Sequence, residues 1–207
     1  MKVLVIGFGS IGKRHAKNVA SLGFDVIVSE PWEKNREEAK QMGFKAFASL
    51  STALKQKPAA AFVCTPTNNH VKPAMQALKS GCHLFIEKPI SHTLSGVRAL
   101  LDLAKKKKKI VCVGCNMRYL DGLTKIKEVL DKKTLGKPLC ARVEFGYHLP
   151  YWHPNQDYRK GYSANKKLGG GIILDAIHEL DYIRWIMGEV KTVYCLAGKI
   201  SGLQMDA

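Results

Sequence analysis

The chain has 207 residues, of which 46% are hydrophobic, and a formal net charge of +16 at pH 7. This composition is typical of a folded globular protein. No apolar stretch approaches the roughly 20 residues that cross a bilayer, so we expect no membrane partner. The chain opens on a strand-like run instead of a signal peptide, so we expect a cytoplasmic location. The positive charge is spread along the chain, and its one dense block, Lys105 to Lys109, closes an expected helix where lysines face water, so we also expect no nucleic-acid partner.

Up to residue 115, short apolar runs rich in β-branched residues alternate with segments of helical period. This rhythm predicts an α/β fold, a Rossmann doubly wound parallel sheet with helices on both faces, over residues 1–117. Strands are expected near residues 2–6, 24–29, 45–48, 59–64, 82–86 and 110–115. Helices are expected near residues 10–22, 32–42, 50–56, 69–80 and 93–107.

The pattern changes after residue 116, and a partial α+β second domain is expected over 118–207. A sheet of about two strands leaves open edges that need cover, so we expect a homo-oligomer. The expected elements are a helix near 119–132, a strand through Val143, Phe145 and Tyr147, an irregular loop over 149–168, a helix from Gly171 to about Met187 and a last strand near 190–199.

Cysteine usage gives no sign of a metal centre. Cys112 and Cys115 have C-x-x-C spacing, but the sequence contains no second pair that would complete a zinc site. Most of the six cysteines lie in apolar runs, where cysteine behaves as a small hydrophobe. We therefore expect reduced thiols and no bound metal.

The string Gly7-Phe8-Gly9-Ser10-Ile11-Gly12 stands between the first expected strand and the first expected helix. In this context Gly7 permits a tight turn, Gly9 lets the backbone approach a pyrophosphate, and Gly12 lets helix and strand pack closely. The helix N-terminus then offers N–H groups to the anion. The string, with Ser10 and Ile11, predicts a nucleotide-cofactor site; an ordinary glycine loop of an α/β protein is the alternative.

Glu30 ends the second expected strand, about 20 positions beyond the glycines, where an acid normally accepts the hydroxyls of the adenosine ribose. A carboxylate there repels a 2′-phosphate, so NAD is the expected cofactor. Lys34 and Arg36 are near in sequence and keep NADP open as an alternative. An exposed acid at a strand end is the structural alternative for Glu30.

Two polar loops follow the fourth and fifth expected strands. One carries Thr65, Pro66 and His70, and the other carries Glu87 and Lys88. Open α/β sheets bind their ligands at the carboxyl ends of the strands, which places both loops at the same edge as the glycine string. We therefore expect all five residues to contact the cofactor.

Four motifs in this order resemble the Gfo/Idh/MocA family of NAD(P)-dependent enzymes, which includes glucose-fructose oxidoreductase and inositol dehydrogenase. The resemblance extends from Met1 to Gly198. The motifs are the glycine string, Thr65-Pro66-Thr67-Asn68-Asn69-His70, Glu87-Lys88-Pro89, and Gly169-Gly170-Gly171 with Asp175 and His178 downstream.

The resemblance implies oxidation or reduction at a hydroxyl carbon of a sugar or cyclitol, with Lys88 and His178 as the catalytic pair and Asp175 beside them. The chemistry of the side chains agrees, because hydride transfer from an alcohol needs a base for the hydroxyl proton and a cation for the developing alkoxide. Asp175 and His178 lie three residues apart on an expected helix and hence on one face. The commonest family pattern separates them by four, so the Asp175 assignment departs from it.

Several further residues are candidates for the ligand site. Asn116, Arg118 and Tyr119 resemble the family's N-x-R stretch beside the nicotinamide, which implies that Asn116 contacts the cofactor and the other two contact substrate. The stretch from Trp152 through His153-Pro154-Asn155-Gln156 to Arg159 is similar to a branch found in bacterial surface-polysaccharide biosynthesis. Trp152, Tyr158 and Arg159 are therefore candidate substrate contacts, because aromatic and guanidinium groups suit stacked or anionic sugars; loop packing is the alternative.

The sequence thus predicts an NAD(P)-dependent oxidoreductase with a small sugar-like substrate. A nucleotide-binding protein without turnover, either a sensor or a truncated remnant, is the alternative, because members of the family that the chain resembles usually continue well past the point where this chain stops and complete the sheet of the second domain.

Overall fold

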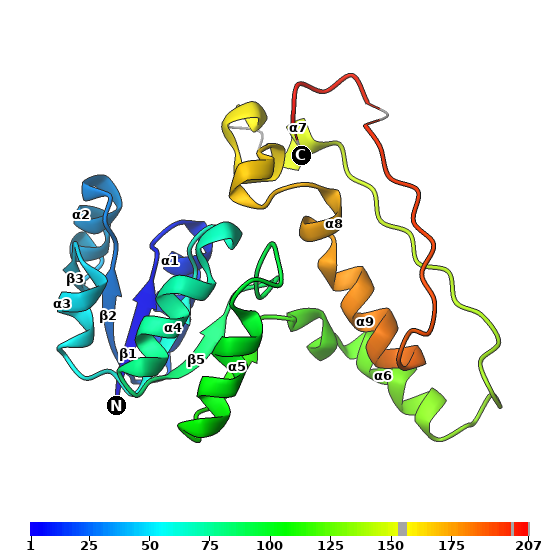
Figure 1. Cartoon of the computed structure of the whole chain (residues 1–207), viewed down its shortest axis with the longest axis horizontal. Helices are drawn as coiled ribbons and strands as arrows, with labels where there is room; N and C mark the ends of the chain where they lie inside the picture. The colour runs from blue at the N-terminus through cyan, green and yellow to red at the C-terminus, as the bar shows by residue number, and fades with distance from the viewer. Residues whose placement is uncertain (153–156, 200, 207) are drawn as a thin grey trace. The chain divides into compact units, whose positions relative to one another are not determined.

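The computed structural model describes residues 1–152, 157–199 and 201–206 (Figure 1). The chain divides into two compact units, Met1–Gly114 and Cys115–Ala207. None of the helices in this described part combines the length and the apolar character that crossing a bilayer requires.

The first unit contains a six-stranded, fully parallel sheet whose order is β3-β2-β1-β4-β5-β6. The order reverses beside β1, which creates the crevice where doubly wound sheets bind their ligands. The predicted Rossmann fold is confirmed. The strands are β1 (Lys2–Ile6), β2 (Asp25–Ser29), β3 (Lys45–Phe47), β4 (Ala60–Val63), β5 (His83–Ile86) and β6 (Val111–Val113).

Five helices connect these strands and bury both faces of the sheet. The helices are α1 (Ser10–Ser21), α2 (Glu33–Gln41), α3 (Leu50–Leu54), α4 (Val71–Lys79) and α5 (Val97–Lys106). The helix expected from residue 93 begins only at Val97, because Gly96 before it takes a left-handed conformation with φ of 74°.

Side chains alternate across the sheet, and each face has its own core. Val3 and Val5 of β1 pack with α1 and α2, whereas Leu4 and Ile6 pack with α3, α4 and α5. Both sets are almost fully buried. Since each buried aliphatic side chain contributes about 1.5–3 kcal/mol, these two layers fix the position of the loops at the strand ends.

The regular elements in the described part of the second unit are helices. Its helices are α6 (Asp121–Asp131), α7 (Leu149–Trp152), α8 (Ile172–Asp175) and α9 (Ile177–Met187), and α6 packs against α9. The region expected to be an irregular loop, 149–168, contains α7 and three 3-10 turns. Together with the turn before α6, these are η2 (Asn116–Tyr119), η3 (Tyr158–Lys160), η4 (Tyr162–Ala164) and η5 (Lys166–Leu168).

Two strand predictions in the second unit were wrong. Neither the run through Val143, Phe145 and Tyr147 nor residues 190–199 form a strand in the structure. Alternation of apolar side chains predicts which face a strand would bury, but a strand also needs a partner for its backbone hydrogen bonds. Neither segment has a partner strand among the described residues, so the apolar side chains of the first run stay exposed.

Candidate functional site

The glycine turn between β1 and α1 is shaped by close backbone packing. Gly7 has φ of 90°, and a Cβ on it would lie 2.9 Å from the carbonyl oxygen of Cys64. A Cβ on Gly12 would lie 2.0 Å from the carbonyl oxygen of Gly7. At both positions a side chain would displace neighbouring backbone, so these two glycines are required by the fold of the turn itself.

Gly9 differs from its two neighbours because open space faces it. A Cβ on Gly9 would meet nothing within 4 Å, and its backbone is extended, with φ of −71° and ψ of −169°. Gly9 is the N-cap residue of α1, and no side chain in the described part of the chain caps this helix or places an acid in its first turn. The first N–H groups of α1, two of them from Ser10 and Ile11, are therefore left for an anion such as a pyrophosphate.

Glu30 connects the end of β2 to the glycine turn. Its side chain is almost fully buried, Oε2 accepts a 2.7 Å hydrogen bond from the N–H of Phe8, and Oε1 accepts a 2.9 Å bond from the N–H of Trp32. Each carboxylate oxygen has a second lone pair, so the ribose role predicted for Glu30 remains chemically available. The structure adds a second role, which is to hold the turn in place.

Arg36 bears on the choice between NAD and NADP. Its Nη1 atom donates to the carbonyl oxygens of Glu30 at 3.1 Å and Pro31 at 2.9 Å. The guanidinium is thus directed at the main chain beside the ribose carboxylate. NAD remains the preferred cofactor because the carboxylate of Glu30 repels a 2′-phosphate, whereas the guanidinium of Arg36 has five N–H donors and engages only Nη1 in these two bonds.

His70 is buried between two loops at the carboxyl edge of the sheet. The imidazole is 1% exposed, with Nδ1 2.9 Å from the carbonyl oxygen of Pro89 and Nε2 2.7 Å from that of Thr65. Burial lowers its pKa, although the two carbonyls and the charge of Glu87 oppose this. His70 therefore joins the loops after β4 and β5 through both ring nitrogens, and its contact with the cofactor stays a prediction.

Thr65 also holds its own loop. Its hydroxyl donates a 2.7 Å hydrogen bond to the carbonyl oxygen of Asn69. Pro66, the other residue expected to contact the cofactor here, directly precedes the 3-10 turn Thr67–Asn69. Both residues stand at the carboxyl edge of the sheet, where ligands of this fold bind.

Glu87 is paired with a residue that the sequence analysis missed. His15, on the second turn of α1, approaches Glu87 with Nε2 2.6 Å from Oε1, and the other carboxylate oxygen accepts a 3.1 Å bond from the N–H of Lys88. The ring of His15 lies against Phe62 and Phe85, with centroids 5.3 and 5.1 Å away. The pair therefore joins the helix of the glycine turn to the loop that carries Lys88.

The electrostatics of Glu87 follow from this pairing. Burial raises the pKa of the carboxyl group, but the hydrogen bond and charge of His15, with smaller effects from Lys88, outweigh it and leave the pKa below its ordinary value. The position of His15, three residues after the last glycine of the string, could have indicated that it lies near the cofactor site. Nothing in the sequence indicated that its partner is Glu87, 72 residues away.

We expect His15→Phe to keep the ring packing against Phe62 and Phe85 while removing the donor to Glu87. The variant should lose about 2 kcal/mol of unfolding free energy at neutral pH, because a partly buried carboxylate loses its hydrogen-bond partner. Since the folded-state pKa of Glu87 is depressed, its contribution is complete above its ordinary value of 4.5 and disappears as the pH falls through the folded value.

Urea denaturation of both proteins from neutral pH down to about pH 3 checks this result. Lys40→Ala, which removes an exposed ion pair on α2, serves as the control and should change stability by less than about 1 kcal/mol. A difference between wild type and His15→Phe that stays constant over the whole pH range would show that the carboxylate is not involved.

In the second unit, Arg118 is engaged with Asp181. Its Nε and Nη2 atoms donate to the two carboxylate oxygens at 2.7 and 2.6 Å, and the guanidinium lies 5.9 Å from the ring centre of Trp185. The hydrogen bonds raise the pKa of Arg118 and lower that of Asp181. Arg118, which was expected to contact substrate, thus uses two of its nitrogens to hold η2 to α9. Asn116 and Tyr119 lie on the same 3-10 turn.

The expected geometry of Asp175 and His178 was wrong. The helix breaks at Ala176, whose ψ is 28°, so Asp175 ends α8 and His178 belongs to α9. The two side chains therefore do not share one helix face. His178 instead precedes Asp181 by three residues on α9 and contributes, after Arg118 and Cys115, to the low pKa of that carboxyl group.

The three other candidate substrate contacts are engaged with residues of the second unit itself. Arg159 donates to both carboxylate oxygens of Asp157 at 2.8 Å and, through Nη1, to Gln204 at 3.2 Å, and this pairing lowers the pKa of Asp157 to about 2. Tyr158 accepts from the N–H of Gln204, and Trp152 lies near the rings of the 145–147 segment. Residues 153–156 of this stretch lie outside the described residues.

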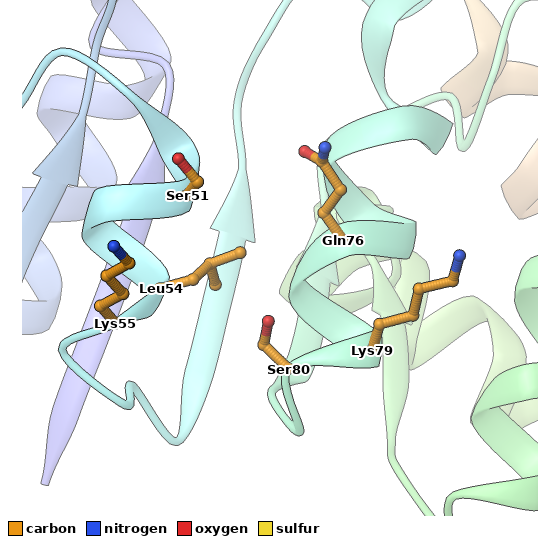
Figure 2. A pocket seen from close by; sticks show the side chains of 6 residues that line it. All are labelled: Ser51, Leu54, Lys55, Gln76, Lys79 and Ser80. Carbon is orange, nitrogen blue, oxygen red and sulfur yellow. The ribbon is translucent and has the colours of Figure 1, made fainter.

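A pocket of about 380 Å³ lies between α3 and α4, lined by Ser51, Leu54, Lys55, Gln76, Lys79 and Ser80 (Figure 2). Both helices run away from the carboxyl edge of the sheet, and most of the lining comes from their C-terminal ends. This pocket is therefore distinct from the glycine turn. No group of three metal-ligating side chains occurs among the residues that the structure describes.

Comparison with known proteins extends over both units. Residues 1–115 match a family model described as an oxidoreductase family with an NAD-binding Rossmann fold, and residues 123–206 match the model of the GFO/IDH/MocA C-terminal domain. The chain is 32% identical over 195 residues to myo-inositol 2-dehydrogenase of Thermotoga maritima, covering 91% of this chain and 55% of that protein.

Two further similarities agree with these matches. The chain is 29% identical over 200 residues to the inositol 2-dehydrogenase/D-chiro-inositol 3-dehydrogenase of Lacticaseibacillus casei, covering 93% of this chain and 54% of that protein. The crystal structure of an NAD-binding protein from Listeria innocua superposes with a TM-score of 0.74 at 30% identity, covering 89% of this chain and 54% of that one. The chain thus spans about half the length of the relatives it matches.

Proposed function

The chain belongs to the Gfo/Idh/MocA family of NAD-binding oxidoreductases, and from that premise we propose that it transfers a hydride between NAD and a hydroxyl carbon of a sugar or cyclitol. The open space at Gly9 before the uncapped N-terminus of α1 is the observation that carries the proposal. Packing of the protein itself does not explain a glycine at position 9, whereas the surrounding backbone already requires glycine at positions 7 and 12.

Residues of the first unit hold the cofactor in this proposal. The N–H groups at the start of α1 bind the pyrophosphate, Glu30 accepts from the adenosine ribose, and the loops after β4 and β5 border the remainder. When bound, NAD supplies the acceptor for the hydride. His15, Glu87 and His70 act as positioning residues, because each connects two of the segments that form this edge.

Lys88 and His178 have the catalytic roles. As the C–H bond of the alcohol is broken, His178 takes the hydroxyl proton, and the ammonium of Lys88 stabilises the negative charge that develops on the oxygen. Asn116 borders the cofactor, and Arg118 and Tyr119 border the substrate. The assignment of Asp175 is limited to a supporting role, because it lies on another helix from His178.

Inositols come first among the proposed substrates because the relatives named above are inositol dehydrogenases. A narrower role in surface-polysaccharide sugar metabolism relies on the stretch around Trp152 and Arg159. In the structure Arg159 directs all three of its side-chain nitrogens to Asp157 and Gln204. We therefore rank nucleotide sugars after cyclitols as candidate substrates.

Calorimetric titration with NAD and NADP, followed by spectrophotometry of NAD reduction with inositols, free sugars and nucleotide sugars, tests this proposal. We expect tighter binding of NAD than of NADP and turnover with at least one cyclitol. Tight NAD binding without turnover across the panel would favour the alternative, a nucleotide-binding protein without activity. Folded protein that binds neither dinucleotide would overturn both.

A cytoplasmic location and self-association belong to the same proposal. All six cysteines are free thiols in the structure, as in proteins of reducing compartments. Exposed apolar side chains such as Phe145, Tyr194 and Leu196 line the extended segments of the second unit. Burial of such side chains against a second copy favours a homo-oligomer.

A further inference from the structure

Trp32 is an exposed aromatic residue of the first unit that has no role in the proposed function. It is the N-cap residue of α2 and follows Glu30 by two positions, and 75% of it is exposed to solvent. A packed tryptophan buries more apolar surface than almost any other side chain. An exposed tryptophan therefore contributes little of this burial to the free energy of folding.

The main chain that carries this indole is nevertheless firmly held. The N–H of Trp32 donates to Oε1 of Glu30 at 2.9 Å, and its carbonyl oxygen accepts from the N–H of Arg36 at 3.0 Å. The guanidinium of Arg36 also donates to the carbonyls of Glu30 and Pro31. The exposed ring therefore projects from a backbone that is fixed on both sides.

The same carboxylate connects this backbone with the glycine turn. Oε2 of Glu30 accepts from the N–H of Phe8, and Oε1 accepts from Trp32. If Glu30 also accepts from the adenosine ribose, the base attached to that ribose lies within a few bond lengths of the carboxylate. Trp32, two residues along, is anchored to that carboxylate through its backbone N–H, so its exposed indole is attached to the chain close to the position of the base.

We propose that Trp32 stacks on the adenine ring of the dinucleotide and supplies much of the affinity for the adenosine half. The inference deepens the proposed function and relies on its cofactor site. A purine has a large flat π-face, and stacking on an aromatic side chain is worth about 1–3 kcal/mol per base. The ligand chemistry that this position selects is therefore an adenine nucleotide.

Binding measurements with three probes test the proposal. Trp32→Ala should weaken NADH and AMP about 10- to 100-fold, while the affinity for reduced nicotinamide mononucleotide, which lacks adenosine, stays within about twofold. Trp32→Phe should restore most of the NADH affinity, because a phenyl ring still stacks. Leu22→Ala, which changes a similarly exposed apolar residue at the far end of α1, is the matched control and should bind all three probes as wild type does.

Fluorescence gives an independent signal. The chain has three tryptophans, and AMP should quench part of the wild-type emission but none of the emission of Trp32→Phe. Unchanged NADH affinity in Trp32→Ala, or an equal loss for NADH and the mononucleotide, would overturn the stacking role while wild-type binding keeps the cofactor site intact. Failure of wild type to bind NADH and AMP would overturn the cofactor site itself.

Discussion

Gly12→Ala is expected to abolish NADH binding and to destabilise the first unit by about 3 kcal/mol, which corresponds to a decrease of roughly 10 °C in Tm. The added methyl group would lie 2.0 Å from the carbonyl oxygen of Gly7, well inside any van der Waals contact. Since the obstacle is backbone, α1 has to move away from the turn. Thermal unfolding followed by circular dichroism, together with NADH titration, measures both effects.

Gly9→Ala is the matched variant three residues earlier. A methyl group on Gly9 meets nothing within 4 Å, and the local backbone suits alanine, so Tm should change by no more than about 2 °C. NADH affinity should still decrease at least about tenfold, because the methyl group occupies space that the pyrophosphate needs. Normal NADH binding by Gly9→Ala would contradict the placement of the cofactor, and a fully stable Gly12→Ala would contradict the geometry of the turn.

Lys88→Met should reduce turnover of the substrate identified in the panel by about 10²- to 10³-fold, because one preorganised charge at the developing oxyanion is worth this much. Methionine keeps the length of the side chain and removes the ammonium. NADH affinity should decrease by no more than about threefold, because the expected contact of Lys88 with the cofactor is one of many, whereas its charge on the substrate oxygen matters most in the transition state. Steady-state kinetics and NADH titration separate the two effects.

The control for this variant is Lys79→Met, which removes a lysine from the pocket between α3 and α4 and should leave turnover unchanged. Thermal unfolding of both variants shows whether a lost activity reflects a lost fold. Lys88→Met with wild-type kinetics would remove the lysine from the mechanism. A large loss in Lys79→Met would indicate that charge anywhere on this unit matters, and not charge at the substrate.

The first unit was predictable because its signals are local. The apolar run from Val3 to Ile6 predicted a buried strand, and the structure assigns its alternate side chains to two separate cores. The glycine string also predicted the turn correctly. The structure adds that packing requires Gly7 and Gly12, whereas the space beside Gly9 is open. These features depend on residues close together in the chain or on a repeated period.

The second unit was less predictable, because its structure depends on partners. The apolar alternation through Val143 and Tyr147 is that of a strand, yet a strand forms only where another backbone completes its hydrogen bonds. The segment from Ile172 to Met187 has the composition of one helix, but the backbone at Ala176 divides it. That break separates Asp175 from His178, which sequence spacing had placed on one face.

The sequence by itself determined the doubly wound sheet, the place of the glycine turn and the polar loops at the carboxyl edge, because periodicity and glycine geometry act over a few residues. Only the tertiary structure decided which side chains meet: His15 with Glu87, His70 with two loop carbonyls, and Arg118 with Asp181. The physical reason is that a hydrogen bond or ion pair is selected by distance in space after the core has packed. His15 and Glu87 are 72 residues apart in the sequence, and nothing in the sequence around either residue predicts that the two side chains meet.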